Sequence, residues 1–147
     1  MEAMTAVRSI EATLQDVWTF VEQPENFVPN LSLIDGSGKK QRTFQYNLES
    51  GSELFVLETE EVVEPTLYKA SVIAPSAQNA YVKQLRLQLE LNCAPKNAGK
   101  TEVELRLIPQ NVPHIPGFMK SQIRNRAQAE LDAFFSQVVA KIEANAK

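Results

Sequence analysis

The stretch that decides the fold is residues 117–147, which read GFMKSQIRNRAQAELDAFFSQVVAKIEANAK. Its apolar residues recur at helical spacing, so the stretch predicts one long amphipathic helix. The chain before it reads mostly as β-strands. A single long helix that follows a series of strands buries its apolar stripe against one face of their sheet. We therefore expect a curved sheet that holds this helix, with a cavity between the two.

Strands are expected where β-prone runs alternate with turn-forming residues. In residues 81–93 the side chains of Leu85, Leu87, Leu89 and Leu91 point one way, and the polar residues between them point the other. Residues 101–108 repeat this alternation, which predicts a hairpin in an antiparallel sheet with one apolar face. In total the pattern predicts about seven strands, at residues 4–12, 31–35, 41–48, 53–63, 67–74, 81–93 and 101–108.

Two short helices are expected after the first strand. Thr13 and Asp16 have the spacing of a helix cap, in which the hydroxyl accepts a backbone N–H and the carboxylate lies at the positive helix end. The helix that they begin extends through Glu22, and its Trp18 is interpreted as a packing residue. Pro24 begins a second helical turn, which Pro29 ends.

Composition narrows the class of protein. A chain of 147 residues with 44% hydrophobic content suits a single domain over residues 1–147. The net charge of −3 and the pI of about 5.3 argue against a nucleic-acid partner. No signal-peptide pattern and no membrane span is expected, which favours the cytoplasm. Cys93 is the single cysteine, and its place on the leucine-bearing face predicts a buried, inert thiol.

The order of these features resembles that of the helix-grip superfamily. The resemblance rests on a first strand leading into Val17-Trp18, on Pro-Glu-Asn at residues 24–26, on the strand meander, and on Phe134-Phe135 in the terminal helix. The superfamily, often labelled SRPBCC, includes START lipid-transfer domains, birch-pollen-allergen-like proteins and the polyketide cyclase/dehydrase group. The resemblance covers nearly the whole chain. It implies an α+β fold with a hydrophobic cavity between the sheet and the C-terminal helix, and no particular catalytic residue.

The terminal helix divides into two halves. Its second half predicts core around Leu131, formed by Ala127, Phe134, Phe135, Val138 and Ile142. Toward the helix start the same face carries Arg124 and Lys120, flanked by Ile123. We hypothesise that a ligand lies against residues 120–127, where the two cations hold the anionic head of an apolar molecule. The alternative interpretation is that both side chains lie along apolar surface and reach water.

Aromatic side chains on the strands are further candidates for the cavity wall. Phe44 and Tyr46 share one face of a strand, and Phe55, Tyr68 and Tyr81 lie on neighbouring elements. The three tyrosines can each supply one of the few polar contacts that orient a ligand in an apolar site. Each aromatic residue can equally belong to the core or to the sheet surface.

Residues for catalysis or metal binding are few. His114 is the only histidine; it is a weak candidate for a general base, and a plain loop histidine is the alternative. With one distant cysteine it predicts no zinc site. Alternation along the strand places Glu58, Glu60 and Glu64 on one face and Glu61 on the other, so this acidic run predicts a solvated surface. We expect neither a metal nor a cofactor.

Three functional classes follow. The first is a carrier or binding protein for a small hydrophobic or amphipathic ligand, anionic in the sharper form of the hypothesis. The second is a polyketide cyclase-like enzyme that uses His114, Arg124 and the tyrosines. The third is an accessory module that recruits a protein partner. A homodimer is a further candidate assembly.

Overall fold

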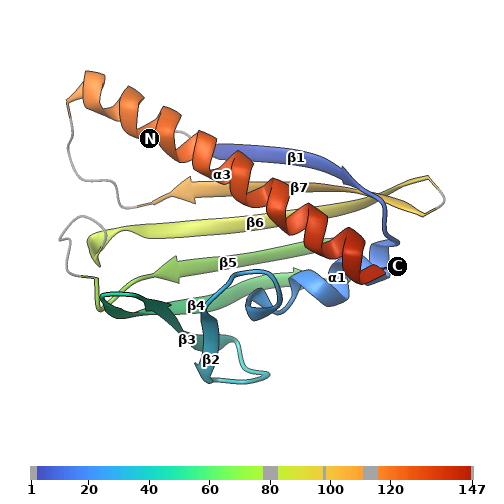
Figure 1. The fold of residues 1–147 in the computed structure, drawn as a ribbon, viewed down its shortest axis with the longest axis horizontal. Helices are drawn as coiled ribbons and strands as arrows, with labels where there is room; N and C mark the ends of the chain where they lie inside the picture. The colour runs from blue at the N-terminus through green and yellow to red at the C-terminus, as the bar shows by residue number, and fades with distance from the viewer. Residues whose placement is uncertain (1–2, 78–82, 98, 111–115, 147) are drawn as a thin grey trace.

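A computed structural model describes residues 3–77, 83–97, 99–110 and 116–146. In this part of the chain seven strands form one antiparallel sheet in the order β1-β7-β6-β5-β4-β3-β2 (Figure 1). The elements are β1 (Met4–Ile10), α1 (Leu14–Val21), the 3-10 turn η1 (Pro24–Asn26), β2 (Leu31–Asp35), β3 (Gln41–Leu48), β4 (Gly51–Val63), β5 (Leu67–Ile73), β6 (Arg86–Asn97), β7 (Lys100–Pro109) and α3 (Gly117–Ala146). The α+β fold expected from the sequence is confirmed.

Most element boundaries follow the sequence pattern. Thr13 caps α1 as predicted, because its Oγ1 accepts a hydrogen bond from the Asp16 backbone N at 3.2 Å. The strand expected at residues 81–93 is shifted, however. Lys83 and Gln84 are helical and β6 starts at Arg86, while residues 81 and 82 lie outside the described residues. Pairing with β7 carries β6 on to Asn97, with Leu91 opposite Leu105 and Cys93 opposite Val103, so the predicted hairpin is confirmed.

A β-bulge in β4 changes which faces the acidic residues occupy. The register with β5 shifts between Thr59 and Glu61, so Glu60 is an extra residue. Glu60 accepts a hydrogen bond from Ser71 Oγ, and Glu61 pairs with Lys69 Nζ at 3.7 Å, so both glutamates lie on the outer face. The prediction that Glu61 lies alone on its face is wrong, because strict alternation assumes a strand without a bulge.

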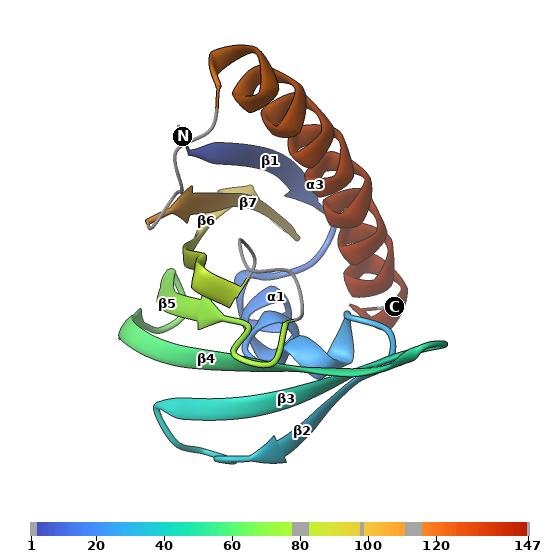
Figure 2. The ribbon, with the colours of Figure 1, turned by 90° about the vertical axis from the view of Figure 1, so that its left-hand side faces the viewer.

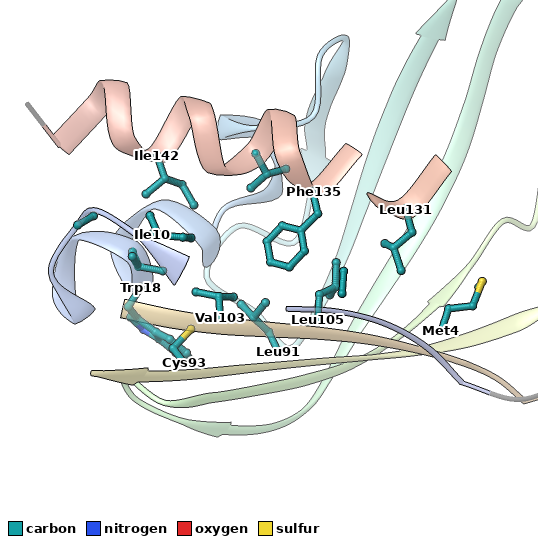
Figure 3. Close-up of a cluster of buried hydrophobic side chains, with 14 residues drawn as sticks. Met4, Ile10, Trp18, Leu91, Cys93, Val103, Leu105, Leu131, Phe135 and Ile142 are labelled. Carbon is teal, nitrogen blue, oxygen red and sulfur yellow. The ribbon is translucent and has the colours of Figure 1, made fainter. Parts of the chain in front are cut away.

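The core consists of two clusters of unequal size. The larger cluster has 14 buried residues from α1, α3 and one end of the sheet, among them Trp18, Leu131, Phe135 and Ile142 (Figure 3). The smaller cluster consists of Phe44, Leu57 and Ala70 on β3, β4 and β5. The sheet curves between them, with α1 inside the curve and α3 across its open side (Figure 2). The apolar stripe predicted for the second half of α3 is confirmed.

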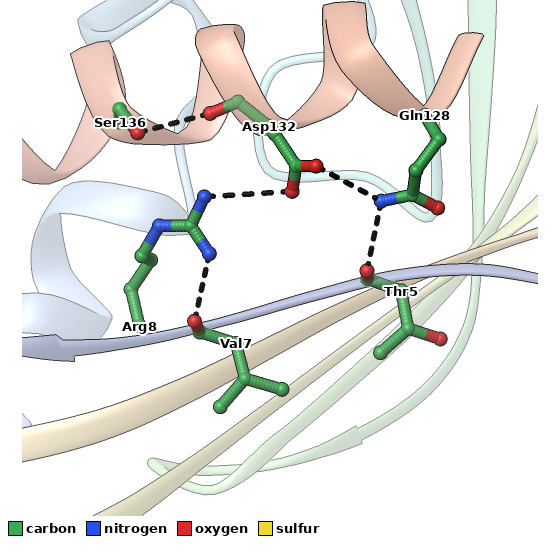
Figure 4. Close-up of polar contacts among 6 residues, drawn as sticks. All are labelled: Thr5, Val7, Arg8, Gln128, Asp132 and Ser136. Carbon is green, nitrogen blue, oxygen red and sulfur yellow. Dashed lines mark hydrogen bonds and ion pairs between the residues drawn. The ribbon is translucent and has the colours of Figure 1, made fainter. Parts of the chain in front are cut away.

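Polar contacts hold α3 along β1, an edge strand of the sheet. Gln128 Nε2 donates to the Thr5 carbonyl at 3.1 Å, and an Asp132 oxygen lies 3.4 Å from Arg8 Nη2 (Figure 4). Nearer the helix end, the Glu11 backbone N donates to Glu143 Oε2 at 2.9 Å. The Thr5 carbonyl on this edge is thereby bonded by the helix rather than left open for another strand.

Candidate functional site

An apolar pocket lies between the two core clusters. Its volume is about 360 Å³, and its walls come from α1, η1 and the segment after it, from β2 to β7, and from α3. The residues that line it are Val21, Pro24, Phe27, Val28, Leu31, Phe44, Tyr46, Phe55, Leu57, Tyr68, Val72, Leu89, Leu91, Leu105, Phe134, Phe135 and Val138. The large cluster supplies one wall and the small cluster the other.

The lining is almost entirely hydrocarbon. Of the seventeen lining residues, only Tyr46 and Tyr68 carry a polar side-chain atom, and none carries a charge. Tyr46 packs edge-on against Phe55, with ring centroids 6.2 Å apart. A pocket of this composition favours ligands that bury apolar surface and require few hydrogen bonds.

The Tyr68 hydroxyl is engaged by its protein neighbours. It accepts a hydrogen bond from Arg42 Nη2 at 2.7 Å and lies 2.9 Å from Thr59 Oγ1. Arg42 Nη1 also donates to the Glu22 carbonyl at the end of α1 at 3.1 Å. Tyr68 therefore gives the pocket its ring, while its hydroxyl joins β5 to β3, β4 and, through Arg42, to α1.

The segment after η1 closes one side of the pocket. Phe27 stacks on Phe20 of α1 and contacts Phe134 of α3, with ring centroids 6.0 and 6.3 Å apart. Lys141 Nζ donates to the Phe27 carbonyl at 3.3 Å and ties the same segment to α3. This aromatic contact brings the wall formed by residues 24–31 against the helix.

Four of the residues singled out in the sequence lie together in the lining, namely Phe44, Tyr46, Phe55 and Tyr68. Tyr81 and His114 lie outside the described residues. The ligand-binding role of the four aromatic residues stays a prediction.

Cys93 is buried as expected, 3% exposed, and burial raises the pKa of its thiol to about 11. Among the described residues no group of acidic, histidine or cysteine side chains is arranged to hold a metal ion.

The pocket meets α3 farther along the helix than the sequence led us to expect. Lys120, Ile123, Arg124 and Ala127 are absent from its lining, which takes Phe134, Phe135 and Val138 instead. The expected ligand contacts at residues 120–127 therefore lie outside this pocket, and their ligand-binding role stays a prediction. The first turns of α3 rise beyond β1 at the edge of the sheet (Figures 1 and 2).

Sequence reasoning missed most of the aliphatic lining. Leu89, Leu91 and Leu105 line the pocket, but the sequence places them only on the apolar face of the sheet, and Val72 is not singled out at all. A usable signal existed, because Tyr68 pairs with Leu91 and Leu91 with Leu105, all on one face. Once Tyr68 was proposed to line a cavity, its cross-strand neighbours on that face were candidates too.

A seven-stranded antiparallel sheet with a pocket beneath a long C-terminal helix defines the helix-grip class of fold. No family model matches the sequence, and no curated protein does so. Solved structures match it over nearly its whole length. A conserved protein from Geobacillus kaustophilus is 14% identical with a TM-score of 0.68, over 100% of this chain and 98% of that chain.

Two further solved structures have the same fold. A START superfamily protein from Mycobacterium smegmatis is 10% identical with a TM-score of 0.66, over 99% of this chain and 97% of that one. A protein from Arthrobacter aurescens is 12% identical with a TM-score of 0.69, over 97% of this chain and 84% of that chain. The chain thus shares its fold with these three structures, and the helix-grip fold implied by the resemblance is confirmed. At these identities the likeness concerns the fold alone.

Proposed function

We propose that the protein binds a small, neutral, mainly apolar molecule in the pocket between its two core clusters. The proposal rests on the residues that line the pocket. None of these seventeen residues is charged, and only two have a polar side-chain atom. The volume of about 360 Å³ is within the range of small-molecule sites. The helix-grip fold, with its sheet wrapped beneath a terminal helix, is compatible with this use.

A neutral ligand is inferred because the lining residues supply few hydrogen bonds and no opposite charge to a ligand. An ionised carboxylate that loses water needs a cation or several hydrogen-bond donors in return. Neither Lys120 nor Arg124 belongs to the lining, and the Tyr68 hydroxyl already has Arg42 and Thr59 as partners. An alcohol, ketone or hydrocarbon therefore suits the pocket better than the anionic ligand that the sequence suggested.

Binding is also favoured over catalysis by this lining. Acid–base chemistry requires a titratable group within hydrogen-bond reach of the reacting atoms. The described lining residues offer only the two tyrosine phenols for this role. An enzyme of the cyclase type would have to bring further groups to the pocket.

The test is a titration with a neutral fluorescent probe, N-phenyl-1-naphthylamine, on three proteins. We expect saturable binding to the wild type, and loss of it in Leu89→Trp, because an indole at this position fills the pocket. Gln88→Trp is the matched control, since Gln88 precedes Leu89 on β6 and its side chain points to the opposite face of the sheet. It should bind like the wild type.

The ligand's charge is tested with the same proteins. Decanol should displace the probe at least about tenfold better than decanoate, because the described lining residues offer no cation to the carboxylate. Equal displacement would contradict neutrality while leaving the pocket as the binding site. Undiminished probe binding in Leu89→Trp would contradict the pocket itself.

A further inference from the structure

The first three turns of α3, residues 117–126, are named here the α3 tip. The first buried side chain of this helix is Leu131, and no residue of the tip belongs to either core cluster, although Lys120 and Arg124 are half-buried. Large apolar side chains nevertheless occur there and face solvent: Phe118 is 71% exposed, and Met119 and Ile123 are each 42% exposed. Such a concentration of exposed apolar residues on a protruding element marks an interaction surface.

The charge of the α3 tip is opposite to that of the whole chain. Lys120, Arg124 and Arg126 lie within it, and no acidic residue occurs between Gly117 and Glu130, although the net charge of the chain is −3. The first turn of α3 has no acidic residue and instead carries Lys120, a cation at the positive end of the helix dipole. In α1 the first turn carries Asp16, the favourable choice. A helix start that departs from the stabilising pattern is typical of a functional surface.

The arrangement of the three apolar side chains excludes some partners. Successive helix residues are turned by about 100°, so Met119 and Ile123 lie one turn apart on the same line, while Phe118 points about 100° away from Met119 and widens the apolar surface beyond a single stripe. A groove on a protein partner selects a stripe, whereas a fluid surface accepts a convex, aromatic tip. A second copy of this chain would bring the cations of two tips together, which is unfavourable.

We propose that the α3 tip docks peripherally on an anionic phospholipid surface. Phe118, Met119 and Ile123 enter the boundary between headgroups and acyl chains, while Lys120 and Arg126 lie among the phosphates. Arg126 is available for this, because its pairing with Glu130 at 3.3 Å is a highly exposed i,i+4 contact of little strength. In the described part of the chain no helix is long and apolar enough to cross a membrane. This docking does not depend on the pocket or its ligand.

The experiment is co-sedimentation of the full chain with vesicles of mixed phosphatidylglycerol and phosphatidylcholine, compared with phosphatidylcholine alone. The wild type should bind the mixed vesicles and release them at high salt. Two double variants test the tip, Phe118→Ser with Ile123→Ser, and Lys120→Gln with Arg126→Gln. Each should lower the partition coefficient about tenfold or more, since each cation near an anionic surface contributes on the order of 1 kcal/mol.

The matched control variants remove exposed apolar or cationic side chains outside the α3 tip. Ile34→Ser removes an apolar residue that is 51% exposed on β2, and Lys39→Gln with Lys40→Gln neutralises two exposed lysines in the turn that follows. Neither control should change vesicle binding, and circular dichroism should show all variants folded. Absence of binding to both vesicles, or equal binding to both, would overturn the proposal. So would a wild-type dimer that the tip variants dissociate, because the partner would then be a second copy.

Discussion

Arg42 shows how a single residue sets the polarity of the pocket. Its guanidinium lies 5.6 Å from the centre of the Phe44 ring and donates to the Tyr68 hydroxyl. It also binds the carbonyl of Glu22, where a cation complements the negative end of α1. The cation thus draws the only polar atom of Tyr68 into a structural network. The spacing around Arg42 indicates only its contact with Phe44 on the same strand, because its two hydrogen-bond partners lie at the end of α1 and on β5.

Cys93 provides a prediction about pH. Burial raises the pKa of its thiol from 9.0 to about 11, so between these values the unfolded chain releases a proton that the folded chain retains. The stability associated with this group is fully present below about pH 9 and is lost as pH rises toward 11. From pH 8 to pH 11 the free energy of unfolding should fall by on the order of 2 kcal/mol more in the wild type than in Cys93→Ala.

Urea unfolding of both proteins at the two pH values measures this difference. All other pH effects are common to both chains and cancel in the comparison. The native thiol should also resist alkylation at pH 8 and react once urea unfolds the chain. Identical pH dependence of the two proteins, or rapid alkylation of the folded wild type, would show that Cys93 is accessible.

Among the elements, α3 is divided between a structural half and an exposed half. Phe135 is 2% exposed in the large cluster, whereas Phe118, on the same helix, is 71% exposed. Phe135→Ala should lower the free energy of unfolding by about 3 to 5 kcal/mol, because it removes a buried ring and leaves a cavity. Phe118→Ala should change it by no more than about 0.5 kcal/mol.

Chemical denaturation of the two variants tests this division directly. The residue type, the substitution and the helix are the same in both, so the difference reports burial alone. Similar losses in both variants would mean that the α3 tip is also packed, and would weaken its assignment as a docking surface.

The sequence was a good guide to elements that depend on local periodicity. Thr13 with Asp16, the leucine alternation of β6 and the Leu131 stripe each require only a few neighbouring residues, and all three are confirmed. The bulge at Glu60 was not predictable in this way. Its position depends on the register of β4 against β5, a contact between strands that periodicity within one strand does not reveal.

The candidate site was less predictable than the elements. Phe44, Tyr46, Phe55 and Tyr68 were found because aromatic residues on an inward face are natural wall residues. The sequence predicts a helix contribution at residues 120–127, whereas the lining of this pocket takes Phe134, Phe135 and Val138 from the second half of α3. How far a helix overlaps a sheet depends on strand lengths and on the crossing direction, and neither is encoded in the helix's own pattern.

For the whole molecule, the pocket separates a strong core from a weak one. The large cluster unites α1, α3, β1, β6 and β7 around 14 buried residues, while the small cluster on the β3 to β5 side has three. Local opening requires least free energy where few apolar groups are buried. The β2 to β4 side should therefore open more readily than the side covered by α3.

Hydrogen exchange followed by mass spectrometry tests this asymmetry with a matched pair of strands. β3 and β7 are both paired on two sides, β3 with β2 and β4, β7 with β1 and β6, so they differ mainly in the core they face. Amides of β3 should exchange at least about tenfold faster than those of β7, a difference of roughly 1.4 kcal/mol in opening free energy.

Saturation with a neutral apolar ligand should slow exchange in β3 and β4 most, because Phe44, Phe55 and Leu57 line the pocket. Equal exchange in β3 and β7 would show that the two clusters open as one unit, and a ligand effect confined to β7 would mean that the pocket does not couple them.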